Sequence, residues 1–75
     1  MSPQSVASYE KVFTALGRFI DQEKWTQVCV MELEGGILLQ GMALVYTGKT
    51  HELVMRTQVL NPKKLRQLMD SVGVK

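Results

Sequence analysis

Two short turns divide the centre of the chain into three segments rich in β-forming residues, and this division constrains the fold more than any other feature. Gly35-Gly36 follows the segment 25–34 and fits a two-residue loop, because glycine readily adopts the positive φ that tight hairpins need. A second turn at 47–50 separates the segment 37–46 from the segment 51–59. Such short loops join antiparallel neighbours. We therefore predict a three-stranded antiparallel meander.

A helix is predicted before the meander, because apolar residues recur there at three- and four-residue spacing. Ser5 or Ser8 is the expected N-cap, and Ser2-Pro3 offers an earlier start. Gly17 interrupts the helix beside its apolar stripe, and we expect a close packing contact there. The stripe consists of Tyr9, Val12, Phe13, Leu16, Phe19 and Ile20.

A second helix is predicted after the meander. Asn61 is its N-cap and Pro62 its first residue, and Leu60 and Leu65 occupy the two positions of a hydrophobic staple. Gly73 ends the helix. Its apolar stripe consists of Leu65, Leu68, Met69 and Val72.

The predicted order is αβββα, an α+β fold with both helices on one face of the sheet, in a single domain covering residues 1–75. A domain of about this size buries only ~60% of the surface of its unfolded chain, so it gains from a further source of stability. Cys29 is the only cysteine and His51 the only histidine, which excludes a disulfide within the chain and a Cys/His zinc site. Oligomerisation is the remaining route.

The two turns predict a register, with Met31 opposite Gln40 in the first hairpin and Tyr46 opposite His51 in the second. Alternation then sorts the side chains onto two faces. We predict that the helices pack on the face with the larger residues: Trp25, Cys29, Met31, Leu33, Leu38, Met42, Leu44, Tyr46, Leu53, Met55 and Val59. The other face carries smaller apolar residues, with charges toward its margins.

The smaller-residue face is the predicted homodimer interface, because monomers rarely expose a large contiguous apolar patch. Gly41 and Ala43 would allow two sheets to approach closely, and Arg56 would pair with an acidic group within or between protomers. The predicted interface consists of Val28, Val30, Gly41, Ala43, Val45, Val54 and Arg56. Two alternatives stay open: partial cover of this patch by the first helix, and a dimer joined through an edge strand.

No arrangement of residues indicates catalysis. Cys29 and His51 fall at distant positions of the predicted sheet, and a thiol buried among methionines is expected to be inert. Glu32 and Glu34 share a face at a hairpin end where no pocket is implied. We therefore predict no catalytic residues, no cofactor and no metal, and expect that the chain is not an enzyme.

Lys63, Lys64 and Arg66 open the second helix, where backbone N–H groups also favour anions, and they form an alternative nucleic-acid contact together with Lys49. The order helix, three strands, helix resembles that of double-stranded RNA-binding domains, which also carry lysines at the start of the last helix. Their Gly-Pro-x-His stretch in the first hairpin is absent, because this chain has 34–37 as Glu-Gly-Gly-Ile.

The formal net charge of +2 is too small to imply nucleic acid or an anionic membrane. No export signal or membrane span is seen, and a lone cysteine fits a reducing compartment, so we expect a cytoplasmic protein. The leading hypothesis is a small homo-oligomeric interaction or adaptor domain, with itself as partner. Nucleic-acid binding is one alternative. The other is small-ligand binding at a dimer interface near Trp25, Tyr46 and His51.

Overall fold

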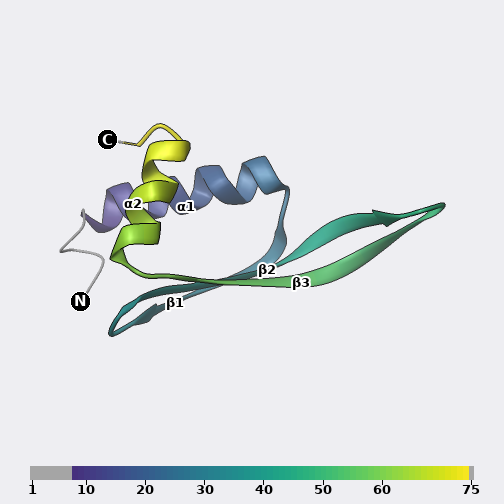
Figure 1. Cartoon of the computed structure of the whole chain (residues 1–75), viewed down its shortest axis with the longest axis horizontal. Helices are drawn as coiled ribbons and strands as arrows, with labels where there is room; N and C mark the ends of the chain where they lie inside the picture. The colour runs from purple at the N-terminus through teal and green to yellow at the C-terminus, as the bar shows by residue number, and fades with distance from the viewer. Residues whose placement is uncertain (1–7, 75) are drawn as a thin grey trace.

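Two helices lie on one side of a three-stranded antiparallel sheet in the computed structural model, which describes residues 8–74 (Figure 1). The elements follow the chain as α1 (Tyr9–Glu23), β1 (Thr26–Leu33), β2 (Gly36–Thr47), β3 (Thr50–Leu60) and α2 (Pro62–Ser71). The strands lie in the order β1-β2-β3. The predicted αβββα order and α+β class are confirmed.

Both helices begin at side-chain caps. The Ser8 hydroxyl accepts a hydrogen bond from the Lys11 N–H (3.3 Å), and the Asn61 side chain accepts one from the Lys64 N–H (2.8 Å). Each bond satisfies a backbone donor that has no partner inside the helix. Asn61 and Ser8 are therefore confirmed as caps, while the alternative starts at Ser5 and Ser2-Pro3 lie outside the described residues.

The end of α2 also follows the prediction. Gly73 adopts a φ of 76°, which glycine tolerates without strain, and the N–H of Val74 donates to the carbonyl of Met69 (2.9 Å). Leu60 and Leu65 of the predicted staple are both buried. The expected close contact at Gly17 is wrong, because a Cβ placed there would meet nothing within 4 Å.

The second hairpin has the predicted register, with Tyr46 opposite His51. The first hairpin does not: Leu33 lies opposite Gly36, so the loop is 34–35 and Met31 faces Leu38 rather than Gln40. Gly36 is the first residue of β2, and a Cβ at this position would overlap the carbonyl oxygen of Leu60, so the glycine allows a close backbone approach. The shift moves partners by two positions and leaves the sorting of faces intact.

A β-bulge near the start of β1 changes the orientation of one important side chain. The pairing of β1 with β2 shifts between Thr26 and Cys29, and Gln27 has a φ of 53°. A bulge inserts one extra residue, so the side chains before it change faces. Trp25 therefore lies on the opposite face from Cys29, contrary to the prediction.

The helices cover the face with the smaller residues, and the predicted choice of face is wrong. Ile37 and Leu39 are 2% and 0% exposed beneath the helices. Trp25 lies against Gly41, where a Cβ would come within 2.8 Å of its ring. Small residues at the centre of this face allow that close approach, so side-chain size alone does not predict which face the helices cover. The core consists of Val12, Ala15, Leu16, Trp25, Ile37, Leu39, Leu60, Leu65, Met69, Val72 and Val74.

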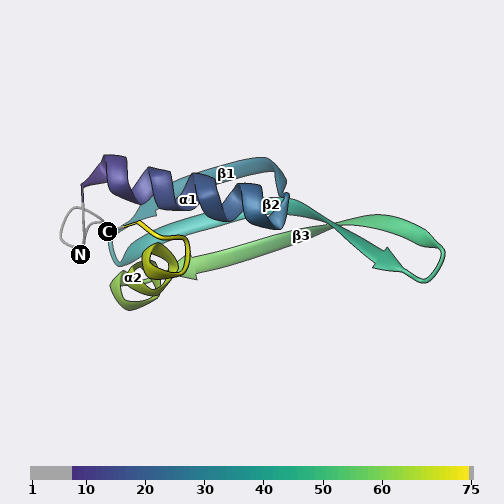
Figure 2. The same cartoon turned by 90° about the horizontal axis from the view of Figure 1, so that it is seen from above.

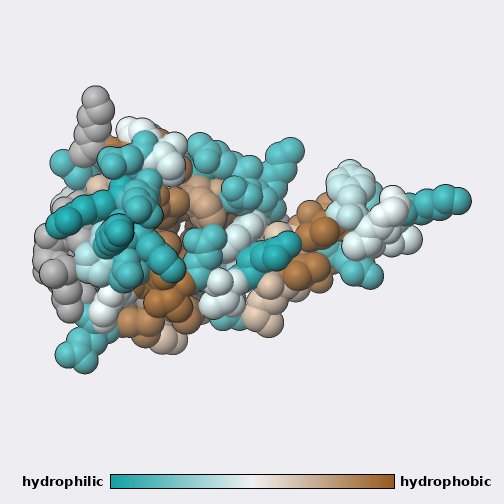
Figure 3. Space-filling view, viewed as in Figure 1, coloured by the Kyte–Doolittle hydropathy of each residue, from teal (hydrophilic) through white to brown (hydrophobic). Residues whose placement is uncertain are grey.

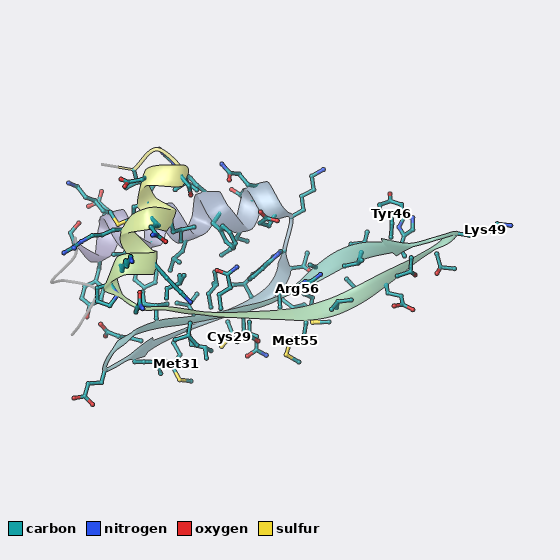
Figure 4. The ribbon with its side chains drawn as sticks, in the orientation of Figure 1. Cys29, Met31, Tyr46, Lys49, Met55 and Arg56 are labelled. Carbon is teal, nitrogen blue, oxygen red and sulfur yellow. The ribbon has the colours of Figure 1, made fainter. Side chains whose placement is uncertain are left out.

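The molecule is elongated because one hairpin extends beyond the helices (Figures 1 and 2). β1 pairs with β2 only as far as Met42, and residues 43–54 continue as a two-stranded arm that ends in the turn between β2 and β3. The whole measures 45 × 24 × 17 Å. The arm twists, as two-stranded ribbons do strongly. Tyr46 and Met55 therefore project to different sides although they belong to the same sheet face (Figure 4).

Candidate interaction surface

The sheet face that turns away from the helices, here called the open face, carries no charged side chain. The opposite face, here called the covered face, lies beneath the helices and includes Val28, Val30, Ile37, Leu39, Gly41, Ala43, Val45 and Val54. Glu32, Glu52 and Arg56 all lie on this covered face, and the charged residue Glu34 is in a turn. Antiparallel sheets with one solvated face normally place polar residues there. The open face consists of Cys29, Met31, Leu33, Leu38, Gln40, Met42, Leu44, Tyr46, His51, Leu53, Met55, Thr57 and Val59.

The large apolar residues of this face are strongly exposed. Met31 and Met55 are 54% and 58% exposed, and Tyr46 is 72% exposed. Cys29, Met31 and Met55 all project from the side of the sheet that faces away from the helices (Figure 4). Hydrophobic side chains are also visible along the root of the arm (Figure 3). Monomeric proteins rarely leave a contiguous apolar surface of this kind in water.

The predicted dimer interface shares the covered face, so the chain's own helices occupy its centre. Gly41 is buried beneath Trp25, and Val28 and Ala43 pack against the core. Of the other predicted members, Val30 and Arg56 are exposed, and Val45 and Val54 lie half-buried in the arm. This face is therefore not free to receive a second copy as a continuous surface.

Glu32 is engaged in a contact between α1 and the sheet. The Tyr9 hydroxyl donates to both carboxylate oxygens of Glu32, at 3.0 and 3.1 Å. The hydrogen bond raises the pKa of Tyr9 above its ordinary value of 10.0, with smaller contributions from desolvation and from the negative charge of Glu32. This exposed bond links α1 to the margin of the covered face.

The structure does not bring Cys29 and His51 together. Cys29 lies opposite Gln40 in the sheet, whereas His51 lies in the arm, where its ring packs on Tyr46 at 4.1 Å between centroids. Cys29 is exposed, so the expectation of a buried thiol is wrong. Within residues 8–74 no group of three or more His, Cys, Asp or Glu side chains is placed to hold a metal ion.

The basic residues form two separate groups. Lys63, Lys64 and Arg66 are exposed on α2. Lys49 lies at the tip of the arm, at the opposite end of the molecule (Figures 1 and 4). The four residues proposed for nucleic-acid contact therefore form no single surface in one copy of the chain.

The ligand pocket expected near Trp25, Tyr46 and His51 is likewise divided. Trp25 lines a hollow of about 440 Å³ together with Arg56. Tyr46 lines a different hollow, of about 370 Å³, together with Leu53. His51 lines neither of the two.

Comparisons with known proteins add no assignment to this geometry. A scan against protein-family models, a search of curated proteins and a search of solved structures each find no match to the chain. Among the described helices, none has the length and apolar character needed to cross a membrane.

Proposed function

We propose that this chain is a small homo-oligomeric interaction or adaptor domain without catalytic activity, whose open face packs on the open face of a second copy. The supporting observation is the open face, which carries no Asp, Glu, Lys or Arg and on which Met31, Met55 and Val59 are each more than half exposed. Removing apolar surface of this kind from water is favourable by about 25 cal/mol per Å². The helices of the chain cover one face of the sheet, and a second copy would cover the other.

The chemistry of the face favours a copy of the same chain over a charged partner. The open face offers no Asp, Glu, Lys or Arg for an oppositely charged surface to pair with, whereas two identical apolar faces match each other about a two-fold axis. The face extends over all three strands, and sheets packed face to face interdigitate their side chains at a spacing of about 10 Å. Methionines at 31, 42 and 55 are flexible enough to fill such a layer.

The test is the absolute mass in solution, measured by light scattering behind a sizing column at low and high salt. The wild-type chain should exceed the 8.5 kDa of a monomer at both salt concentrations, because an apolar interface is not screened. Met31→Glu places a charge on the open face and should weaken this assembly. Lys11→Glu makes a charge change on the exposed side of α1 and should leave it unchanged.

A monomeric wild-type chain would contradict the proposal. So would a Met31→Glu chain that remains folded by circular dichroism and assembles as strongly as the wild type. Loss of assembly in Lys11→Glu as well would mean that net charge, rather than the open face, controls association.

A further inference from the structure

The outer edge of β3 is the long, regular edge of this sheet. The strand is 11 residues long, contains no proline or glycine, and pairs with β2 without interruption. The other edge belongs to β1, which has 8 residues and carries the bulge at Gln27. A regular edge strand exposes backbone N–H and C=O groups that can pair with another strand, and bulges are one way to prevent this.

The charges on β3 are arranged symmetrically about Val54. Glu52 precedes Val54 by two positions and Arg56 follows it by two positions, and both lie on the covered face. When a strand pairs antiparallel with its own copy, the two-fold axis passes between two copies of one residue. Residues equally far on either side of the axis then lie opposite each other and share a face.

Only an axis at Val54 places these opposite charges together. It sets Glu52 opposite Arg56 of the second copy, and by symmetry repeats the pair on the other side. An axis at position 53 or 55 leaves both charges opposite uncharged residues. An axis at position 52 or 56 places like charges opposite each other, which is destabilising.

We propose that β3 pairs with β3 of a second copy about an axis at Val54, so that two chains form one six-stranded sheet. Both Glu52 and Arg56 are exposed, and within the described residues neither forms an ion pair in its own chain. On the open face the same register sets Leu53 opposite Met55 of the second copy, which adds an apolar cross-strand pair. The edge of β3 is thus complementary to the same edge of a second copy.

The surroundings of the edge leave room for this pairing. Where β3 approaches α2, a hollow of about 560 Å³ lies beside Gln58, Val59 and Gln67, which leaves open space next to this end of the strand. The proposed register places Thr50 of the second copy opposite Gln58, which brings the turn of the second arm to this hollow. The arm also gains stability, because an isolated two-stranded ribbon is only marginally stable and the pairing makes the arm four-stranded.

This edge interface is separate from the open-face interface, and either can exist without the other. Its axis is perpendicular to the sheet, so all helices stay on one side and the open faces of both copies stay on the other. Two six-stranded sheets can then pack through their open faces, which gives a closed tetramer with perpendicular two-fold axes. The wild-type mass expected from both interfaces is that of four chains.

Charge reversal tests the edge interface. Glu52→Arg and Arg56→Glu, made singly, place like charges opposite each other and should raise the Kd of the edge contact by about tenfold or more. The double variant Glu52→Arg/Arg56→Glu restores opposite charges in the same register and should restore assembly. Lys63→Glu, an exposed charge change on α2, is the control. The mass is measured by sedimentation equilibrium at low salt.

The Met31→Glu background separates the two interfaces. With the open face blocked, the edge should still hold a dimer, and Glu52→Arg should convert that dimer to a monomer. The edge proposal is wrong if Met31→Glu alone gives monomers, if single reversals leave the mass unchanged, or if the double variant fails to restore it. Loss of the wild-type assembly in Glu52→Arg but not in Met31→Glu would keep the edge and reject the open-face interface.

Discussion

The two faces of the sheet divide their residues in a way that opposes the usual pattern of a half-buried sheet. The covered face has small residues at its centre and carries Glu32, Glu52 and Arg56, whereas the open face is larger, apolar and uncharged. The connections decide which face is covered. Leu60 ends β3 on the covered face and Pro62 begins α2 two residues later, so the helix starts on that side. Chain geometry, rather than side-chain size, therefore selects the face that the helices bury.

The largest expected contrast between the faces comes from shortening one side chain on each. Leu39→Ala removes a fully buried side chain from the covered face and should lower the free energy of unfolding by about 2–5 kcal/mol. Met31→Ala shortens a residue that is 54% exposed on the open face, so it should affect stability mainly through association. Urea denaturation at two protein concentrations measures both effects.

Concentration dependence distinguishes the two roles. The loss from Leu39→Ala should be similar at both concentrations, because this residue acts inside one chain. The loss from Met31→Ala should grow with concentration, since binding of a second copy to the folded state adds stability by mass action. Equal losses for both variants at every concentration would mean that the faces do not differ as described.

A second contrast uses the same substitution at two glycines. Gly41→Ala places a Cβ 2.8 Å from the Trp25 ring and 3.3 Å from Val28, and overpacking of this kind costs about 1–3 kcal/mol. Gly17→Ala adds a methyl group in open space on α1, where alanine is favoured over glycine by up to ~1 kcal/mol. Thermal or urea unfolding should therefore show opposite signs for the two variants.

Near-UV circular dichroism provides the check on Gly41→Ala, because the substitution should disturb the environment of the only tryptophan. If Gly41→Ala proves neutral with an unchanged tryptophan signal, Trp25 does not lie against Gly41. If Gly17→Ala destabilises the chain, then α1 makes a contact at this position, as the sequence had suggested.

Cap and turn residues in the sequence predict the local structure correctly, but they do not predict which face of the sheet the helices cover. Asn61-Pro62, Gly73 and the second turn carry strong sequence signatures, and each appears where predicted. The bulge could not be predicted, because Gln27 is neither glycine nor asparagine and yet adopts positive φ. That bulge turns Trp25 toward Gly41 and so completes the covered face.

The sequence predicts the open face to be covered by the helices, and this prediction is wrong for a related reason. Apart from Trp25, the large residues of the sheet share a face as predicted. An uncharged group of large residues is typical of a core, and only the path of the connections shows that the helices lie on the other face. The exposure of Cys29 and Met31 follows from that path and not from their identity. The symmetry of Glu52 and Arg56 about Val54 is visible in the sequence, but it gains meaning only once β3 is known to lie at the edge.

The smallest expected effect concerns the contact that holds α1 at the margin of the covered face. Tyr9 can donate its hydrogen bond to Glu32 only while its hydroxyl is protonated, so folding raises its pKa above 10.0. A raised folded-state pKa means that the contribution to stability is complete below the unfolded-state pKa of about 10 and is lost as the pH rises through the folded-state value. The stabilising effect of this bond should therefore persist at neutral pH and disappear in strong alkali.

Absorbance at 295 nm measures the Tyr9 titration in a Tyr46→Phe background, which leaves one tyrosine in the chain. Glu32→Gln removes the carboxylate that accepts the bond and should lower the pKa of Tyr9 toward its ordinary value. Tyr9→Phe should remove the part of the alkaline stability loss that this bond causes, measured as urea stability on both sides of pH 10. An unchanged titration in Glu32→Gln would mean that the Tyr9 hydroxyl does not donate to Glu32, and that other contacts hold α1 at this margin of the covered face.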